Sequence, residues 1–185
     1  LLFGLGRPEE ALEQARRAAA MDPLNVNAVG WVGMALNYFG RSDEAIPACM
    51  KAIELDATFL PTYLGLTVAY EATGRLEDAI ATAEKMASMV KLPLTLSVKG
   101  WVYGCAGRHD EAMRLLQELQ DLSKHVYVSP ASFALIHAGT GDVEAWRKAM
   151  WAAYEDRAPG VVVMRVLSAF RALRSDPVFQ EIVRK

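Results

Sequence analysis

Apolar stretches alternate along the chain with stretches that begin with two acidic residues, and a glycine marks each boundary. The boundary motif reads GRPEEA at Gly6, GRSDEA at Gly40, GRLEDA at Gly74 and GRHDEA at Gly107, at spacings of 34, 34 and 33 residues. A degenerate copy, GDVEAW, begins at Gly141, again 34 residues further on. Self-similarity at this period predicts an all-α, right-handed superhelical solenoid, in which each unit is a helical hairpin that stacks on its neighbours.

Each motif predicts the turn of one hairpin. The glycine supplies the left-handed residue that closes the first helix, and the acidic pair lies in the first turn of the second helix, where the helix dipole favours negative charge. Prolines at 23, 61, 93 and 130 separate successive hairpins, because proline begins a helix more easily than it continues one. The predicted first helices are 27–39, 61–73, 94–106 and 130–139, and the predicted second helices are 8–21, 42–55, 76–90, 109–123 and 142–157.

A small residue recurs five positions after each of the first four turn glycines, as Ala11, Ala45, Ala79 and Ala112. A small side chain there lets two helices cross closely. Trp146 stands at this place in the fifth copy. The fifth hairpin is therefore either shifted by one residue, so that it uses Ala145, or it packs as an atypical end unit. We expect Trp146 and Trp151 to cover the end of the stack together with the segment that follows.

The pattern resembles the tetratricopeptide repeat over essentially the whole chain. The family's glycine stands at Gly33 and Gly100, and its large residue three positions later at Leu36, Tyr70 and Tyr103. The resemblance divides a single domain into a partial repeat 1–25, repeats 26–59, 60–92 and 93–126, a degenerate repeat 127–158, and a helical cap 159–185. Within the cap we expect a short helix at Val161 to Val163 and a last helix that begins at Asp176 and Pro177.

The resemblance also implies a binding surface, since in this family the first helices of successive repeats line a concave groove. The residues that it places there as partner contacts are Asn27, Met34, Asn37, Tyr38, Leu64, Val68, Glu71, Ser97, Trp101 and Leu135. Tyr38 and Trp101 are the predicted anchors, because large rings with few rotatable bonds are favoured at binding hot spots. For each of these residues, contact with an adjacent helix is the alternative.

Composition bounds the classes of partner. The chain has 185 residues and a formal net charge of −2, which gives no concentrated positive surface for nucleic acid. No apolar run approaches the ~20 residues needed to cross a bilayer. The two cysteines, Cys49 and Cys105, lie in different repeats, which favours free thiols and a reducing, cytoplasmic setting.

Candidate catalytic chemistry is sparse. Cys105 and His109 are four residues apart, but Gly107 interrupts the helix between them and no third metal ligand is evident. No nucleophile elbow, phosphate loop or dinucleotide motif is present in the sequence. The acidic pairs recur at equivalent helix starts, which indicates a role in folding. We therefore predict a non-enzymatic protein-binding module without metal or cofactor; a self-association module, and an enzyme with its site in the groove, are the alternatives.

A second resemblance concerns the C-terminal part of the chain. The stretch from Tyr127 to Pro177 is similar to the C-terminal tetratricopeptide region of bacterial multidomain signalling proteins, which carry a kinase, adenylate cyclase or winged-helix domain. This resemblance implies a cytoplasmic regulatory protein whose catalytic or DNA-binding part lies upstream. The chain opens inside a predicted hairpin at Leu1, so we expect it to be a fragment with partly uncovered side chains at Leu1, Leu2, Phe3 and Leu5.

Overall fold

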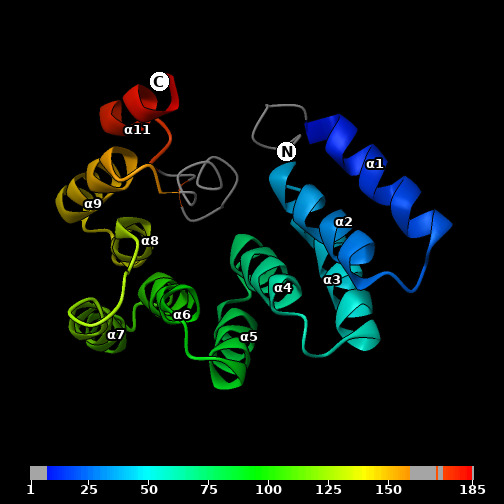
Figure 1. Ribbon diagram of the computed structural model, residues 1–185, viewed down its shortest axis with the longest axis horizontal. Helices are drawn as coiled ribbons and strands as arrows, with labels where there is room; N and C mark the ends of the chain where they lie inside the picture. The colour runs from blue at the N-terminus through cyan, green and yellow to red at the C-terminus, as the bar shows by residue number, and fades with distance from the viewer. Residues whose placement is uncertain (1–7, 159–169, 171–172, 185) are drawn as a thin grey trace. The chain divides into compact units, whose positions relative to one another are not determined.

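The described residues of the chain form helices and no strands (Figure 1). The structure is a computed structural model, and it describes residues 8–158, 170 and 173–184. The helices are α1 Pro8–Met21, α2 Val26–Tyr38, α3 Ser42–Leu55, α4 Leu60–Ala72, α5 Leu76–Met89, α6 Pro93–Cys105, α7 His109–Leu122, α8 Pro130–Thr140, α9 Val143–Glu155 and α11 Pro177–Arg184. The predicted all-α fold is confirmed, and the predicted hairpin helices agree with these bounds to within two residues.

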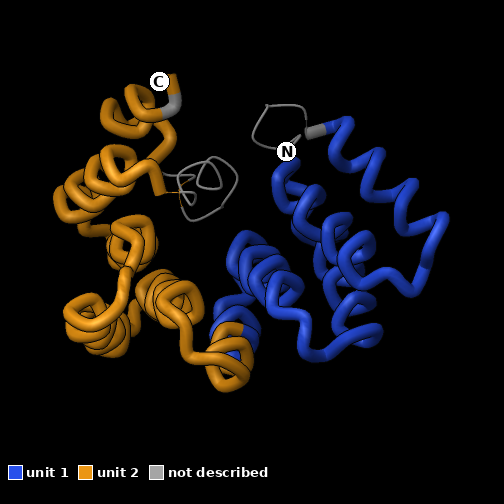
Figure 2. The backbone as a smooth tube through the Cα atoms, viewed as in Figure 1, with its two compact units in different colours: residues 1–82 blue, residues 83–185 orange. Residues whose placement is uncertain are grey.

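The chain separates into two compact units, residues 1–82 and 83–185 (Figure 2). The boundary falls inside α5, which is the second helix of a predicted repeat, and does not fall between two repeats. In unit 1, α2 packs against α1, α3 and α4; in unit 2, α6 packs against α7 and α8, and α9 packs against α8 and α11. The predicted helix at Val161 to Val163 lies outside the described residues, as do Leu1, Leu2, Phe3 and Leu5.

The hairpin turns form as the motif predicts. Gly40, Gly74, Gly107 and Gly141 all have φ between 70° and 76°, a conformation that costs a residue with a Cβ atom about 1 to 2 kcal/mol. The residue after each glycine donates its backbone N–H to a carbonyl five positions earlier, as from Arg41 to Leu36 at 2.9 Å. This hydrogen bond closes the first helix in a Schellman motif. The acidic residues then occupy the first turn of α3, α5 and α7.

The core of unit 1 is built from small residues between α2 and α3. Ala45, Cys49 and Ala52 on α3 have no exposed surface. A Cβ atom on Gly33 of α2 would overlap the Sγ atom of Cys49, so the two helices approach each other because this position is a glycine. Burial raises the pKa of the Cys49 thiol to about 12. Cys49 is therefore a packing residue whose reactive thiolate is suppressed.

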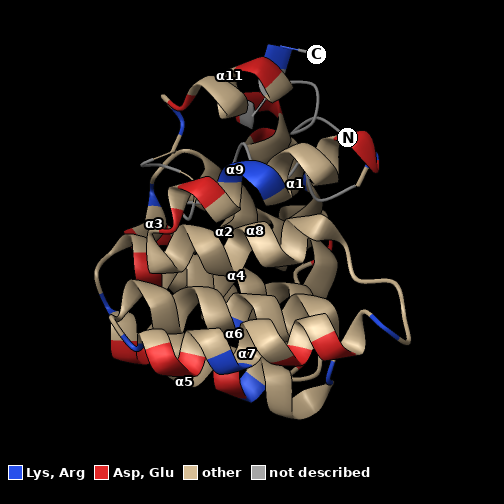
Figure 3. Cartoon of the chain, turned by 90° about the vertical axis from the view of Figure 1, so that its left-hand side faces the viewer, with Lys and Arg blue, Asp and Glu red and all other residues tan. Residues whose placement is uncertain are grey.

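In unit 2 the backbones of α6 and α8 touch. A Cβ atom on Gly104 would lie 2.6 Å from the carbonyl carbon of Gly139, and a Cβ atom on Gly139 would overlap the carbonyl oxygen of Trp101. A Cβ atom on Gly100 would meet the Ile136 side chain at 2.7 Å. Figure 3 shows the charge pattern that goes with this packing: α7 carries charged residues, whereas α6 and α8 are almost free of them. Buried first helices and charged second helices thus alternate in this unit.

The last hairpin ends in an aromatic cluster. Trp146 on α9 has no exposed surface, and its ring lies 6.3 Å from that of Phe170 and 6.4 Å from that of Phe179 on α11. Ala145 is only half-buried, so the hairpin is not shifted by one residue, and the atypical end unit is the alternative that holds. Asp176 caps α11 by accepting the backbone N–H of Val178 at 2.9 Å and also binds Arg147 of α9. The predicted start of the last helix is confirmed.

Candidate functional site

One face of α2 is open in unit 1. Asn25 caps the helix by accepting the backbone N–H of Ala28 at 3.1 Å, and the turn at Gly40 ends it. Between these ends, Asn27 and Trp31 are exposed, and Met34 and Tyr38 are half-buried. Their spacing of four, three and four residues places them on a single helix face. We call these four residues the α2 stripe; Trp31, with half of its surface exposed, is its most open large side chain.

The α2 stripe is fixed in place by the contact between α2 and α4. The Asn37 amide nitrogen donates to the carbonyl oxygen of Gly65 on α4 at 2.8 Å. A Cβ atom on Gly65 would lie 3.1 Å from the Met34 sulfur, so Met34 packs directly over α4. The Asn37 carbonyl oxygen is buried and accepts no hydrogen bond from the described residues. Asn37 therefore acts on the stripe by positioning the helix that carries it.

Other predicted contacts on α4 differ in how open they are. Leu64 and Glu71 are half-buried, whereas Val68 is 2% exposed. The neighbouring Thr67 is fully buried and donates its hydroxyl to the Tyr63 carbonyl at 2.8 Å. A partner can therefore reach Leu64 and Glu71 on this helix, while Val68 belongs to the packed interior.

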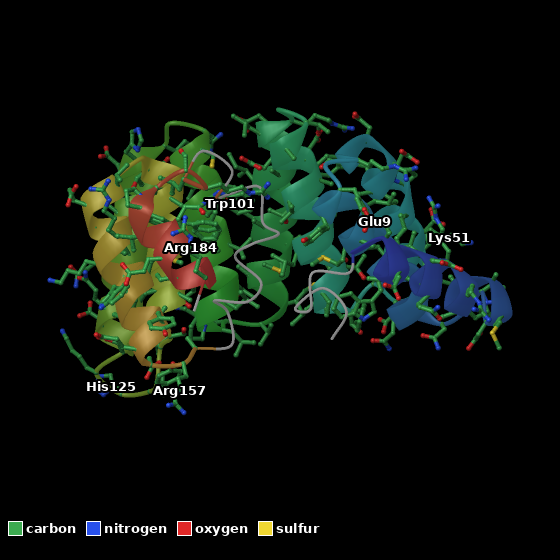
Figure 4. All side chains as sticks on the ribbon, turned by 90° about the horizontal axis from the view of Figure 1, so that it is seen from above. Glu9, Lys51, Trp101, His125, Arg157 and Arg184 are labelled. Carbon is green, nitrogen blue, oxygen red and sulfur yellow. The ribbon has the colours of Figure 1, made fainter. Side chains whose placement is uncertain are left out.

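The three predicted partner contacts in unit 2, Ser97, Trp101 and Leu135, are all buried. Leu135 is 5% exposed, and Ser97 is fully buried with its hydroxyl donating to the Leu94 carbonyl at 2.9 Å. Trp101 is 1% exposed, and Figure 4 labels it among the side chains of the unit. His125 and Arg157, in contrast, lie at the outer edge of the unit in this view. Trp101 can contact a partner only after its neighbours move, so its anchor role stays a prediction.

Sequence reasoning missed Trp31. The family register selects positions along the first helix, and Trp31 lies between the selected Asn27 and Met34. The signal that identifies it is the spacing of large residues on one face, Trp31, Met34 and Tyr38, which stands in the sequence independently of any family pattern. Exposure then distinguishes Trp31 from Trp101, since a sequence pattern does not tell which tryptophan a neighbouring helix covers.

The titratable groups of the described residues show structural roles. Among these residues, no three His, Cys, Asp or Glu side chains are grouped as metal ligands. The Tyr103 hydroxyl donates to the Glu84 carboxylate, and burial together with this bond raises the pKa of Tyr103 to about 12. Lys99 places its ammonium 5.4 Å from the centre of the Tyr103 ring. The hydrogen bond between Tyr103 and Glu84 joins α5 to α6, and the contact of Lys99 with Tyr103 lies within α6.

Burial also lowers the pKa of His137, near the turn between α8 and α9, while Asp142 raises it by a smaller amount. The Nδ1 atom of His137 lies 3.9 Å from the Asp142 carboxylate, which is too long for a hydrogen bond. A lowered pKa favours the neutral imidazole in the folded unit. His137 is thus a half-buried part of the hairpin turn.

No described helix has the combined length and apolarity that crossing a membrane requires.

Comparison with known proteins agrees with the repeat pattern. Solved structures with a similar fold include a thermophilic TPR protein of Thermus thermophilus, at 21% identity and a TM-score of 0.69, with 92% of this chain and 94% of that chain covered. MamA is similar at 21% identity and a TM-score of 0.59 over 82% of this chain and 92% of that chain. A tetratricopeptide repeat protein of Parabacteroides merdae has 12% identity and a TM-score of 0.58, over 99% of this chain and 73% of that chain. At these identities the likeness shows the fold alone.

The sequence of no curated protein matches this chain. Family models described as tetratricopeptide repeats match residues 1–58 and 93–118. These two segments lie in different units, and each holds helices of the hairpins described above. The matches identify residues 1–58 and 93–118 as tetratricopeptide-repeat segments, and the helical hairpins of the described residues have the fold of the solved tetratricopeptide-repeat proteins.

Proposed function

We propose that the chain is a non-catalytic protein-binding module and that the α2 stripe with Leu64 of α4 binds a segment of a partner protein. The observation that carries this proposal is the open aromatic face of α2, with Trp31 half exposed and Met34 and Tyr38 half-buried beside it. Tetratricopeptide repeats generally serve protein interaction, which supports the same conclusion.

The chemistry of this face favours an apolar segment. Trp31, Met34, Tyr38 and Leu64 carry no charge, and the rings of Tyr38 and Phe39 meet edge to face with centroids 5.9 Å apart. Affinity at such a surface comes from burial of a few large side chains. Raised salt should therefore change the affinity little, because screening acts mainly on exposed charges.

The test begins with a displayed library of random twelve-residue peptides selected on the 185-residue chain. Selected peptides are then titrated calorimetrically against variants. Trp31→Ala and Tyr38→Ala should each raise the dissociation constant by roughly 10- to 100-fold, the range for a binding anchor. Met50→Ala is the matched control, since Met50 is as exposed as Trp31 but lies on α3. Peptides that bind a variant carrying both Trp31→Ala and Tyr38→Ala as tightly as the wild type would show that the α2 stripe is not the binding site.

A second measurement separates the predicted anchor Trp101 from Trp31 of the α2 stripe. Because Trp101 is buried, Trp101→Ala should lower the midpoint of urea unfolding, whereas Trp31→Ala should leave it nearly unchanged. A Trp101→Ala variant that keeps full stability and loses peptide binding would place the site in unit 2 instead.

A further inference from the structure

Helix α1 carries a hollow of about 470 Å³ along one face. The side chains that α1 contributes include Glu9, Glu13, Arg16 and Arg17, and the opposite wall is formed by Phe39 and Arg41. The α1 residues are spaced by three and four positions, so they form one continuous row on the helix. We call this row with its opposite wall the α1 face.

Charge is divided along the α1 face. Its first half is acidic, with Glu9 and Glu13, and its second half is basic, with Arg16 and Arg17. Apolar surface comes from Ala20, which follows these charges along α1, and from the half-buried Phe39 on the opposite wall. Met21, four residues after Arg17, extends the row beyond the hollow and is 85% exposed. A helix with this order of charges is complementary to an antiparallel copy of itself.

The charges at the centre of the α1 face have no partner within the described part of the chain. Glu13 and Arg17 are exposed, and the described residues provide neither of them with a hydrogen bond or an ion pair. Arg41, on the opposite wall, is already paired with Glu44 through two hydrogen bonds of 2.6 Å. This pairing lowers the pKa of the Glu44 carboxyl. Arg16 of α1 also acts electrostatically on the Glu44 carboxylate, so the charges of the α1 face that remain unpaired within the described residues are Glu13 and Arg17.

A second hollow, in unit 2, is lined by charged residues that are largely paired within the unit. It has a volume of about 390 Å³ and is lined by Lys91, Glu118, Asp121, Leu122 and His125. Lys91 is paired with Glu118, and Asp121 is paired with Lys124 at 2.7 Å. Its charges are thus largely satisfied within the unit, in contrast to those of the α1 face.

We propose that the α1 face binds the α1 face of a second copy of the chain, with the two helices antiparallel across a two-fold axis. Reversal of the helix places Glu13 of each copy opposite Arg17 of the other, and the symmetry makes this contact twice. The same approach covers Ala20, Met21 and Phe39 on both copies, which removes apolar surface from water. The surface is distinct from the α2 stripe, so the proposal does not depend on the proposed function.

The interface is small and is formed by one helix from each copy, which corresponds to weak association with a dissociation constant on the order of 100 μM. Exposed ion pairs are screened by salt. Sedimentation velocity of the 185-residue chain over about 5 to 500 μM should therefore show a monomer–dimer equilibrium that weakens between low and high salt. A wild-type chain that stays monomeric across this range overturns the proposal.

Charge reversal identifies the contact. Glu13→Arg places two arginines opposite each other and Arg17→Glu places two glutamates, so each variant alone should associate about tenfold more weakly or not at all. An equimolar mixture of the two variants restores both attractive pairs, and it should form a heterodimer at least as readily as the wild type dimerises. Recovery in the mixture also shows that both variants are folded.

Matched controls are Lys51→Glu and Glu54→Arg on α3, which reverse exposed charges of unit 1 outside the α1 face. They should associate as the wild type does. If Glu13→Arg and Arg17→Glu associate like these controls, or if their mixture gains nothing over either variant alone, the copies meet through another surface and the proposal is wrong.

Discussion

The two units bring their first helices together in different ways. In unit 1, side chains stand between α2 and α4: Met34 packs over Gly65, and Asn37 donates to the Gly65 carbonyl at 2.8 Å. In unit 2, α6 and α8 meet backbone to backbone at Gly104 and Gly139. Both pairs occupy the same place in the repeat. The size of one or two residues therefore decides how closely neighbouring first helices approach.

The two kinds of helix crossing go with different burial of the first-helix side chains. The wider crossing in unit 1 leaves Trp31 exposed, with Met34 and Tyr38 half-buried. The closer crossing in unit 2 accompanies the nearly complete burial of Trp101 and Leu135. Met34 and Trp101 hold the same position in their repeats, yet Met34 is half-buried and open to a partner, whereas Trp101 stabilises the fold, because burial against a neighbour removes a side chain from reach.

The largest losses of stability are expected where Ala45 and Trp146, which hold the same position in their repeats, are each replaced by the other's type of residue or by alanine. Trp146 is fully buried in unit 2, and Trp146→Ala should lower the free energy of unfolding by about 4 kcal/mol through the cavity it leaves. Ala45 holds the same position in unit 1, and Ala45→Trp should cost about 3 kcal/mol through overpacking. Urea unfolding monitored by circular dichroism measures both.

Glu44→Trp provides the control for this exchange, because Glu44 is the exposed neighbour of Ala45. It should change the unfolding curve much less than Ala45→Trp. Equal losses for the two variants would mean that the assigned register of α3 is wrong.

Adding a methyl group at each first-helix crossing tests the comparison directly. Gly139→Ala should destabilise the chain by about 3 kcal/mol, since the new Cβ meets the backbone of Trp101, which has no room to move. At Gly65 the new Cβ meets the flexible Met34 side chain and Cys49 at 3.1 Å. The helix propensity gained there, about 1 kcal/mol, offsets much of the strain. Thermal unfolding measures the stability of both variants. Similar losses of stability for Gly139→Ala and Gly65→Ala would contradict the difference between the two helix crossings.

The Asn37 hydrogen bond gives an intermediate effect. Asn37→Ala removes the bond to the Gly65 carbonyl and should cost about 1 kcal/mol, the net value of one such bond. It should also weaken peptide binding at the α2 stripe, because α2 is then held less firmly against α4. A variant that loses stability while peptide affinity stays unchanged would show that Asn37 does not position the stripe. Chemical unfolding and calorimetric titration provide the two readouts.

The smallest effect is expected at the end of α9. Arg157 has a φ of 51°, the left-handed conformation that the four turn glycines adopt elsewhere. Arg157→Gly should stabilise the chain by about 1 kcal/mol by relieving this strain, and Gly107→Ala should destabilise it by a similar amount. Differential scanning calorimetry detects both changes. A lower melting temperature for Arg157→Gly would mean that the arginine side chain contributes more than its backbone costs.

Much of the fold follows from particular residues. The turn glycines Gly40, Gly74, Gly107 and Gly141 and the acidic pairs after them define helix ends that the structure reproduces to within two residues. The candidate site was only partly predictable. Met34 and Tyr38 were identified from the repeat register, but the same register selected the buried Trp101 and passed over Trp31. The repeat register predicts on which face of a helix a residue lies. Whether that side chain is exposed depends on the packing of a neighbouring helix.

The sequence by itself determined the helices, their order and the hairpin pairing, because these depend on local residues: a glycine with positive φ, an acidic first turn and a small residue at the crossing. Only the tertiary structure decided the distance between first helices, the burial of Trp146 under Phe170 and Phe179, and the charges left unpaired on α1. These features depend on atoms that are far apart in the sequence, and a contact between them exists only once the helices are packed.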